Sequence, residues 1–453
     1  MRFSIAPPQS EDLSNPSRTI QSYWTETAPP ERPGAPLEGD VETEVAIIGG
    51  GYTGLACALT LARDHGVQAT VLEAGDIGWG ASGRNGGIVS IDCTQLSLRE
   101  KQRRVGEAET IRFYASQAEA VVNLRALIAE EGIACDASGA SVLEVASSPR
   151  GYEEMAQQVS YYTQKLGLRA RRLSRDALRE ESFESPYAFG ALECAPAFSV
   201  HPLKLVLGIA AAAVRGGAVL HPNSAVRSWR REGRRHLLET DRGTVRARFV
   251  ALATNGFPPT RLQPSVTSRA LPVLSNIIVT RPLSDEQREA HGWRDHRPMY
   301  DDRNLLRYFR MLPDGRFLLG ARGDVWGTET GAKAMRQALL RDLEAMFPAW
   351  ADVPITHFWR GPICATLSRA PSIGRSQDDP TVLFAFGYHG TGVNSATWCG
   401  AALARLIAEG DDGEEGIPSL YRGRPPRVPF PGLKPYLVGA GLLWRGLRDR
   451  LGF

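Results

Sequence analysis

The sequence is short of lysine. Its 453 residues carry 53 basic side chains against 50 acidic ones, for a net charge of +3, and only five of the basic residues are lysines. A balance this close to neutral argues against nucleic acid as the main partner, because phosphate-binding surfaces usually leave a clear basic excess. The skew toward arginine is typical of genome base composition, since surface physics seldom demands it.

Paired cysteines, a leader and long apolar runs are also missing. None of the six cysteines forms a C-x-x-C pair, so the pattern predicts no metal site, no disulfide framework and a cytoplasmic location. The N-terminus is rich in proline and lacks the apolar centre of a secretory signal. The longest apolar runs, 205–214 and 436–444, are too short to span a bilayer.

A regular pattern of strands and helices begins after residue 40. Residues 1–40 hold seven prolines and read as an extended arm or tail. A strand is then expected at 44–48, a glycine turn, a helix over 53–65 and a second strand over 68–73. This succession predicts an α/β fold with a parallel, doubly wound sheet of the Rossmann type.

The glycine turn fits the dinucleotide pattern G-x-G-x-x-G. Gly49 allows the tight turn, Gly51 lets the backbone approach a pyrophosphate, and Gly54 permits close packing of helix on strand. The helix N-terminus offers free N–H groups to phosphates. Glu73 follows at the end of the next strand, where it would accept hydrogen bonds from a ribose.

The pattern alone does not separate a nicotinamide from a flavin dinucleotide. Two further glycine-rich segments, GDIGWGASGRNGG at 75–87 and GYHGTG at 387–392, lie far away in the sequence. Three such turns suit one long resident cofactor that is contacted along its length. The chain shows no second G-x-G-x-x-G for a nicotinamide.

A second group of elements predicts a mostly antiparallel sheet. Strands are expected at 140–145, 275–280, 305–310 and 316–320, with Asp314-Gly315 as a hairpin turn. We expect the dinucleotide-binding domain to be discontinuous, over 41–135, 197–262 and 358–412. A substrate domain would take 136–196 and 263–357, and a C-terminal extension 413–453.

Four segments together resemble the D-amino-acid oxidase superfamily in its glycine and sarcosine oxidase-like branch. They are VAIIGGGYTGL at 45–55, GWGASGRNGG at 78–87, LSRAPSIGR at 367–375 and FGYHGTGVNSATWCGAALARLIAEG at 386–410. Within that branch the chain is most similar to the gamma-glutamylputrescine oxidase group. The resemblance implies one FAD, hydride transfer from an amine carbon to flavin N5, hydrolysis of the imine, and flavin reoxidation by dioxygen with release of hydrogen peroxide.

The resemblance also assigns residues. Arg84 would pair with the flavin or a substrate carboxylate, or else brace its loop, and His389 lies in the late glycine loop; both are candidate catalytic residues. On the strand after 305, alternation places Arg307 and Phe309 on one face and Tyr308 and Arg310 on the other, and Arg307 and Tyr308 are candidate catalytic residues. The expected FAD contacts are Gly49, Gly51, Tyr52, Thr53, Gly54, Glu73, Ala74, Ala81, Ser82, Arg84, Asn85, Gly86, Gly87, Val226, Thr254, Asn255, Gly387, His389, Gly390, Thr391, Gly392 and Val393.

The chain departs from sarcosine oxidases at two places. Asn394 and Leu318 stand where those enzymes have lysines, one for the substrate carboxylate and one for dioxygen. The departure leaves an amine oxidase and a dehydrogenase coupled to an electron carrier both open, with a non-catalytic flavoprotein as a third alternative. Cys364 lies near the place where some sarcosine oxidases attach FAD covalently, and we expect it to be a buried apolar residue and the FAD to be non-covalent.

The C-terminal stretch 435–453 is apolar and carries Arg445, Arg448 and Arg450. Such a segment either lies on a membrane surface, which would suit electron transfer to a quinone, or packs as a helix on its own domain.

Overall fold

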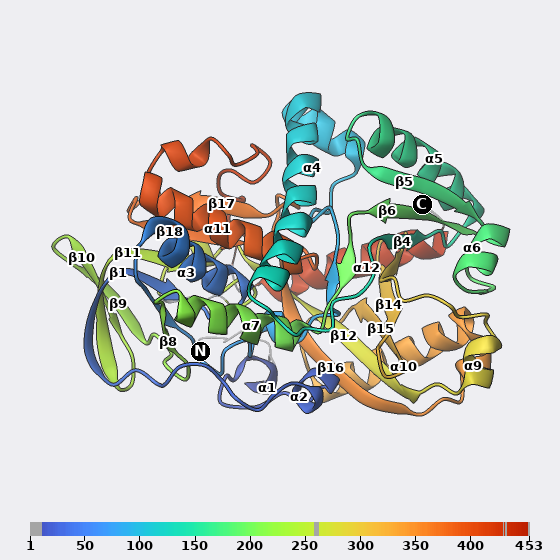
Figure 1. The fold of residues 1–453 in the computed structure, drawn as a ribbon, viewed down its shortest axis with the longest axis horizontal. Coiled ribbons are helices and arrows are strands. Elements are labelled where there is room, and N and C mark those ends of the chain that lie inside the picture. Colours follow the sequence, from blue (N-terminus) through green and yellow to red (C-terminus); the bar gives the residue numbers. More distant parts are fainter. Residues whose placement is uncertain (1–10, 258–261, 429, 431–432, 452–453) are drawn as a thin grey trace, which may run out of the picture.

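The computed structural model describes residues 11–257, 262–428, 430 and 433–451, and its fold is built on two large sheets (Figure 1). The first sheet has the strand order β17-β18-β11-β1-β2-β8, and β9 and β10 extend it from β11. Its members are β1 (Gly39–Ile48), β2 (Ala69–Leu72), β8 (Val219–His221), β9 (Ser228–Glu232), β10 (Arg235–Glu239), β11 (Gly243–Leu252), β17 (Ser372–Arg375) and β18 (Val382–Phe386).

The centre of this sheet is parallel. Strands β8, β2, β1, β11 and β18 all run in the same direction, as the predicted βαβ unit requires. Three helices pack together beside it: α3 (Tyr52–His65), α7 (Pro202–Arg215) and α11 (Val393–Glu409). Every residue from Tyr52 to Leu61 is buried, because α3 is enclosed by the sheet and by both other helices. The Rossmann-type arrangement expected from the sequence is confirmed.

The second sheet has the order β16-β12-β15-β14-β13-β4-β6-β5. All neighbours in it are antiparallel except β4 and β13, so the expected mostly antiparallel sheet is also confirmed. Asp314 and Gly315 lie between β14 and β15, where the hairpin was expected. The strands are β4 (Val142–Val145), β5 (Arg169–Ser174), β6 (Gly190–Ala195), β12 (Leu271–Pro282), β13 (Met299–Asp301), β14 (Arg307–Met311), β15 (Arg316–Arg322) and β16 (Ile355–Ala365).

One face of the second sheet is covered by α10 (Glu329–Met346) and the 3₁₀ turn η2 (Pro348–Trp350). An aromatic core fills this contact, with Phe347 stacked on Trp350 at 4.5 Å between ring centroids. The opposite face carries Ile277, Leu318 and Trp359, which belong to the same apolar cluster as helices α3, α7 and α11. That shared core fixes the two sheets relative to each other.

Shorter elements complete the chain. A two-stranded ribbon pairs β3 (Ile88–Val89) with β7 (Phe198–Ser199), and the long helix α4 (Leu98–Glu130) is kinked at Gly106. Further helices are α1 (Glu11–Ser14), α2 (Tyr23–Thr27), α5 (Pro149–Gln164), α6 (Arg175–Glu181), α8 (Pro264–Thr267), α9 (Asp285–Glu289) and α12 (Lys434–Leu451), with 3₁₀ turns η1 (Ala81–Gly83) and η3 (Asp412–Glu414).

One expected boundary falls inside a strand, and the N-terminal arm is packed against the molecule. Strand β16 starts at Ile355 and pairs with β12 along its whole length, so residues 358–365 are hydrogen bonded in the second sheet and not in the first. Within the N-terminal arm, Tyr23 and Trp24 are buried, and the Trp24 indole N–H donates to the carbonyl of Asn85 at 2.9 Å. The arm is therefore attached to the glycine-rich segment.

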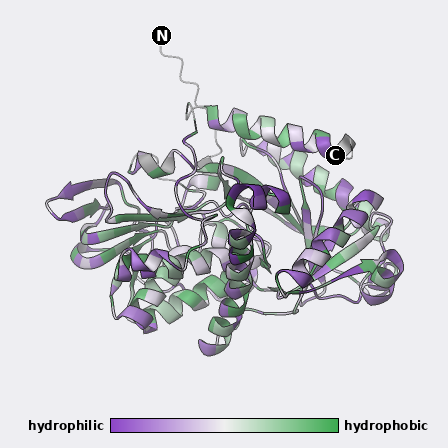
Figure 2. Cartoon of the chain, turned by 90° about the horizontal axis from the view of Figure 1, so that it is seen from above, coloured by the Kyte–Doolittle hydropathy of each residue, from purple (hydrophilic) through white to green (hydrophobic). Residues whose placement is uncertain are grey.

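Helix α12 lies at the periphery of the molecule, and several of its apolar side chains are exposed (Figure 2). Within the described residues, no helix is both long enough and apolar enough to cross a membrane.

Candidate functional site

The turn after β1 leaves space beside the start of α3. Gly49 has a φ of 116°, a left-handed conformation that favours glycine. A Cβ on Gly54 would lie 2.0 Å from the carbonyl oxygen of Gly49, so only glycine allows the helix to come this close to the turn. Gly51 itself has no side chain to cap α3, and the Tyr52 N–H donates to the Ser82 hydroxyl at 3.0 Å, so the positive end of the helix dipole lies beside the cavity that Gly51, Tyr52 and Thr53 line.

Glu73 lies at the end of β2, beside this turn. Its carboxylate accepts the N–H groups of Gly50 at 2.7 Å and of Gly75 at 3.0 Å. Burial raises the pKa of Glu73, and the two backbone donors oppose that change. Each carboxylate oxygen keeps a free lone pair, so Glu73 can still accept the hydroxyl groups of a ribose.

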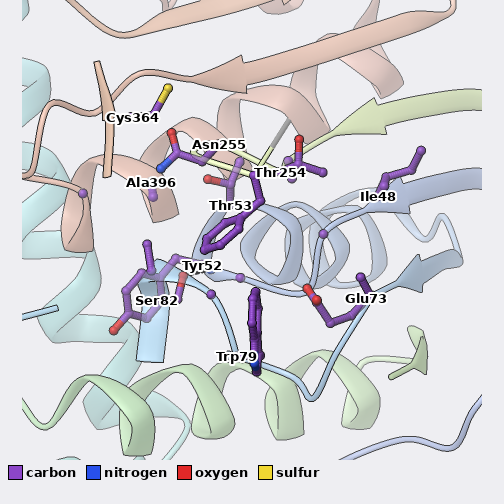
Figure 3. A pocket seen from close by; sticks show the side chains of 18 of the residues that line it. Ile48, Tyr52, Thr53, Glu73, Trp79, Ser82, Thr254, Asn255, Cys364 and Ala396 are labelled. Carbon is purple, nitrogen blue, oxygen red and sulfur yellow. Dashed lines mark hydrogen bonds between the residues drawn. The ribbon is translucent and has the colours of Figure 1, made fainter. Parts of the chain in front are cut away.

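A cavity of about 340 Å³ extends from Glu73 past the helix N-terminus. Figure 3 shows Glu73 and Trp79 on one side of it and Asn255 and Cys364 on the other. Of the expected cofactor contacts, it is lined by Gly49, Gly51, Tyr52, Thr53, Glu73, Ala74, Ala81, Ser82, Asn85, Val226, Thr254, Asn255, His389, Gly390, Gly392 and Val393.

Three expected contacts do not line the cavities described here. Gly54 has the packing role given above, and a Cβ on Gly87 would meet the carbonyl oxygen of Val200 at 2.0 Å. Gly387 donates its N–H to the side-chain oxygen of Asn255 at 3.0 Å. These glycines shape the loops that carry the lining residues.

A second cavity, of about 260 Å³, opens from the first. The two share the lining residues Ala81, Asn85, Ile363, Gly390 and Val393, and the remaining expected contacts Arg84, Gly86 and Thr391 line the second. Its far wall is the second sheet, with Ser275, Tyr300, Tyr308 and Arg322. A long dinucleotide in the first cavity would thus present its ring end to a chamber walled by the second sheet.

The unsatisfied hydrogen-bond donors of Arg84 indicate that a polar cofactor fits this cavity. Its Nε donates to the carbonyl of Trp79 at 2.7 Å, and its guanidinium lies 4.1 Å from the centre of the Trp79 ring. Both terminal nitrogens are buried and have no hydrogen-bond partner within the described part of the chain. Burial lowers the Arg84 pKa to about 10. A buried cation with two unused donors is costly unless a polar or anionic group binds it, as a flavin dinucleotide would.

Tyr308 lies in the second cavity, and it shares its face of the strand with Arg310, as the alternation predicts. Its hydroxyl is 2.7 Å from that of Ser275, and burial raises its pKa to about 12. Arg310, on the same face, donates to the carbonyls of Gly86 at 3.0 Å and Val200 at 2.7 Å. Tyr308 is therefore a neutral hydroxyl near the ring end, while Arg310 braces the glycine-rich segment.

Arg307, the other candidate on this strand, points the other way. Its Nε lies 2.5 Å from the Asp342 carboxylate on α10, so it belongs to the helix-covered face and lines neither cavity. The physical reason is the two-residue period of the strand, which sends neighbours to opposite faces. The geometry does not support a catalytic role for Arg307.

His389 lines the first cavity and is almost completely buried. Burial, together with the nearby Arg322, lowers its pKa to about 3, so the imidazole is neutral at ordinary pH. Its Nε2 lies 3.1 Å from the Thr366 hydroxyl, and its carbonyl accepts Arg322 Nη2 at 2.6 Å. His389 can hold a hydrogen bond to a cofactor but is a poor proton acceptor.

The two positions at which sarcosine oxidases have lysines, 318 and 394, are buried. Leu318 belongs to the apolar core between the sheets, and the Asn394 amide is buried with no partner in the described part of the structure, which nothing here explains. No lysine among the described residues lines either cavity. Lys101, however, is buried behind the wall of the second cavity, with its Nζ 2.5 Å from the Asp92 carboxylate.

Several residues of the second cavity carry no sequence signal. One of them is Arg322, at the end of β15, and burial lowers its pKa to about 10. At another part of the wall, Gln158 and Tyr162 on α5 approach Glu144 on β4 and Tyr300 on β13. Only the strand order of the second sheet brings these four together.

Comparison with known proteins agrees with this geometry. The family model DAO, FAD dependent oxidoreductase, matches residues 44–406. The chain is 29% identical to gamma-glutamylputrescine oxidoreductase of Escherichia coli over 95% of this chain and 98% of that protein, and 32% identical to the probable oxidoreductase OrdL of Rhizobium meliloti over 94% and 97%.

Solved structures share the fold. Glycine oxidase from Bacillus cereus superimposes with a TM-score of 0.67 and 19% identity, over 84% of this chain and 99% of that one. L-proline dehydrogenase from P. horikoshii gives 0.69 and 18%, over 89% and 99%. With a family match over most of its length and a dinucleotide cavity whose lining fits the cofactor, the chain belongs to the DAO family of FAD-dependent oxidoreductases.

Proposed function

We propose that the chain oxidises the carbon–nitrogen bond of a gamma-glutamyl amine or a closely related amine, with dioxygen as the final electron acceptor. The observation that carries this proposal is the second cavity, which opens at the ring end of the cofactor cavity and is walled by tyrosines and opposite charges. Similarity to the Escherichia coli enzyme over nearly its full length supports the substrate class.

The residues that would hold FAD are those of the first cavity. Glu73 would accept the ribose, the N-terminus of α3 would face the pyrophosphate, and the segments around Asn85 and Gly390 would enclose the ring. When bound, FAD supplies the acceptor for a hydride from the carbon next to the substrate nitrogen. The amides of residues 390–393 can stabilise negative charge at the pyrimidine edge of the ring as fixed dipoles.

The chain itself orients the amine and excludes water. Tyr308 and Ser275 offer hydroxyl groups to the substrate, and Arg322 and Arg84 make the ring end of the cavity electropositive. An electropositive site favours the neutral form of the reacting amine, which is the form that gives up a hydride. The resulting imine takes up water and yields an aldehyde with ammonia or an amine.

An electron carrier in place of dioxygen is the second candidate. The observation in its favour is that no described lysine lines either cavity, in keeping with Asn394 and Leu318 at the positions where sarcosine oxidases have lysines. The two acceptors are separated by the yield of hydrogen peroxide per substrate oxidised in air. A yield near one supports the oxidase, and a yield near zero supports the dehydrogenase.

The test of the proposed function is flavin reduction without oxygen. Purified protein should be yellow, and a gamma-glutamyl amine should bleach its absorbance, with free amines, N-methyl amino acids and buffer as comparisons. A protein that cannot be loaded with FAD would contradict the proposal, and a loaded flavin that no member of the panel reduces would contradict it in favour of a non-catalytic flavoprotein.

A further inference from the structure

We propose that Glu144 binds a second, positively charged amino group of the substrate, several bonds away from the carbon that is oxidised. This inference rests on the proposed function and narrows its substrate class to amines that carry a remote ammonium group. It assigns a specificity-determining role to a residue in the second cavity that lies outside the cofactor-binding segments.

The strand register places Glu144 away from the ring end. Glu144 on β4 lies opposite Tyr300 on β13, and Tyr300 lies opposite Tyr308 on β14. Two strand spacings of about 4.8 Å put the Cα atoms of Glu144 and Tyr308 about 10 Å apart. A Cβ on Gly86 would lie 2.8 Å from the Tyr308 ring, so Tyr308 marks the cofactor end of this row. The span suits a substrate with a chain of several atoms between its two amino groups.

Glu144 is a carboxylate without a counter-ion. Among the described residues, its carboxylate accepts hydrogen bonds from Gln158 Nε2 at 3.1 Å and from the Tyr300 hydroxyl at 3.5 Å. No basic side chain of the described chain forms an ion pair with it, whereas Asp92 in the same wall is paired with Lys101. A buried carboxylate without a cation tends to take up a proton, and an ammonium group that enters this end of the cavity would stabilise its charged form.

The surroundings of Glu144 also favour a cation. Asp92 and Asp302 are close enough to raise its pKa further, so the local field is negative. The cavity wall beside it contains Tyr162 and Tyr300, whose rings can contact an alkylammonium group. Glu144 keeps part of its surface accessible, and that surface faces the cavity.

The two ends of the cavity therefore differ in sign. Arg84 and Arg322 line the ring end, and Glu144, which has no ion pair among the described residues, lines the remote wall. A substrate with two amino groups would be oriented by this difference, because the group beside the arginines loses its proton while the group at Glu144 keeps it. The amine to be oxidised is thus selected by the position of the other one.

The experiment compares pairs of amines that differ only in the remote ammonium group. Suitable pairs are 1,4-butanediamine with n-butylamine, and gamma-glutamylputrescine with N-glutarylputrescine. Flavin reduction without oxygen, followed against concentration in the FAD-loaded protein, gives a Kd and a limiting rate for each compound. Binding is read independently from the change in the oxidised flavin spectrum when the compound is mixed with the protein.

In the wild type, the member with the ammonium group should bind at least about 10-fold more tightly, the usual range for a charge-assisted contact. Glu144→Gln should reduce that preference to within about 3-fold, because the amide keeps the shape and removes the charge. Glu154→Gln, on the exposed side of α5, is the matched control and should keep the full preference.

Glu144→Asp provides a second test if the glutamine variant fails to fold. It keeps the charge but withdraws it by one methylene, so the preferred diamine should be one methylene longer than the diamine that the wild type prefers. A wild type with no preference, a Glu144→Gln variant that keeps it, or a Glu144→Asp variant with unchanged length dependence would overturn the inference. If no amine reduces the wild-type flavin, the proposed function fails, and the spectral binding measurement still decides the role of Glu144.

Discussion

The side chain of Tyr308 crosses a neighbouring strand to bring its hydroxyl within 2.7 Å of the Ser275 hydroxyl. Tyr308 belongs to β14 and Ser275 to β12, and β15 runs between them. The crossing is possible because β15 has Gly320 at this point, where a Cβ would lie 2.1 Å from the Tyr308 ring. One glycine thus fixes the position of a tyrosine in the wall of the second cavity.

We expect Gly320→Ala to displace Tyr308 and weaken substrate binding. Overpacking of this kind should cost about 1–3 kcal/mol of folding free energy. The Kd from flavin reduction should rise roughly 10-fold, while FAD content stays unchanged because Gly320 does not line the cofactor cavity. Tyr308→Phe loses only the hydroxyl contact and should lower the free energy of unfolding by about 1 kcal/mol. Gly374→Ala is the control, because its Cβ would lie 3.7 Å from the Phe384 ring, an ordinary contact distance. An unchanged substrate Kd in Gly320→Ala would contradict the argument.

The cofactor half of the site could be predicted because its signals are local. Gly49, Gly51 and Gly54 have a fixed spacing beside a strand and a helix, and a backbone turn of that kind has few alternatives. The alternation that separates Tyr308 from Arg307 is equally local, and the structure confirms it. The same local pattern could not say which of the two faces meets the cavity, so both were candidates.

The substrate half could not be predicted, because sequence periodicity says nothing about which strands become neighbours. Glu144 and Tyr300 are adjacent only because β4 pairs with β13 in parallel. Lys101 meets Asp92 only because α4 begins close to the cavity wall. The domain boundary expected at 358 is a failure of the same type, since β16 continues without a break from Ile355 to Ala365.

Cys364 should not attach FAD covalently. The thiol lines the cofactor cavity, but burial raises its pKa to about 12, so the reactive thiolate is scarce at pH 8. Acid precipitation should therefore release all the flavin into the supernatant, and Cys364→Ala should bind as much FAD as the wild type. Flavin fluorescence that stays with the protein band on a denaturing gel would contradict this prediction.

Helix α12 should help to hold the rim of the second cavity. The Asp449 carboxylate accepts the backbone N–H groups of Asn304 at 2.7 Å and Leu305 at 3.0 Å, next to the cavity residue Leu306. Asp449→Ala should loosen α12, increase its cleavage in limited proteolysis and raise the substrate Kd by about 3-fold or more. Arg448→Ala, at an exposed position, should do neither. Equal cleavage of wild type and Asp449→Ala would count against this role.

The charge on Glu144 should make substrate preference depend on pH. Burial raises the pKa of its carboxyl to about 7, so the carboxylate is present above that pH and is replaced by the neutral acid below it. The titratable groups around it are Asp92, Tyr162, Cys194, Tyr300 and Asp302.

As pH falls below about 7, the Kd of an ammonium-bearing amine should rise relative to that of its uncharged partner, by up to about 10-fold per unit. The two Kd values must be compared as a ratio, because the reacting amine of both compounds also gains a proton at low pH. That effect on Kd is common to both compounds and cancels in the ratio. A bound cation lowers the pKa of Glu144, so the ratio should level off again at lower pH. In Glu144→Gln the ratio should stay flat from about pH 5.5 to 8.5. A flat ratio in the wild type would mean that the carboxylate does not contact the substrate cation.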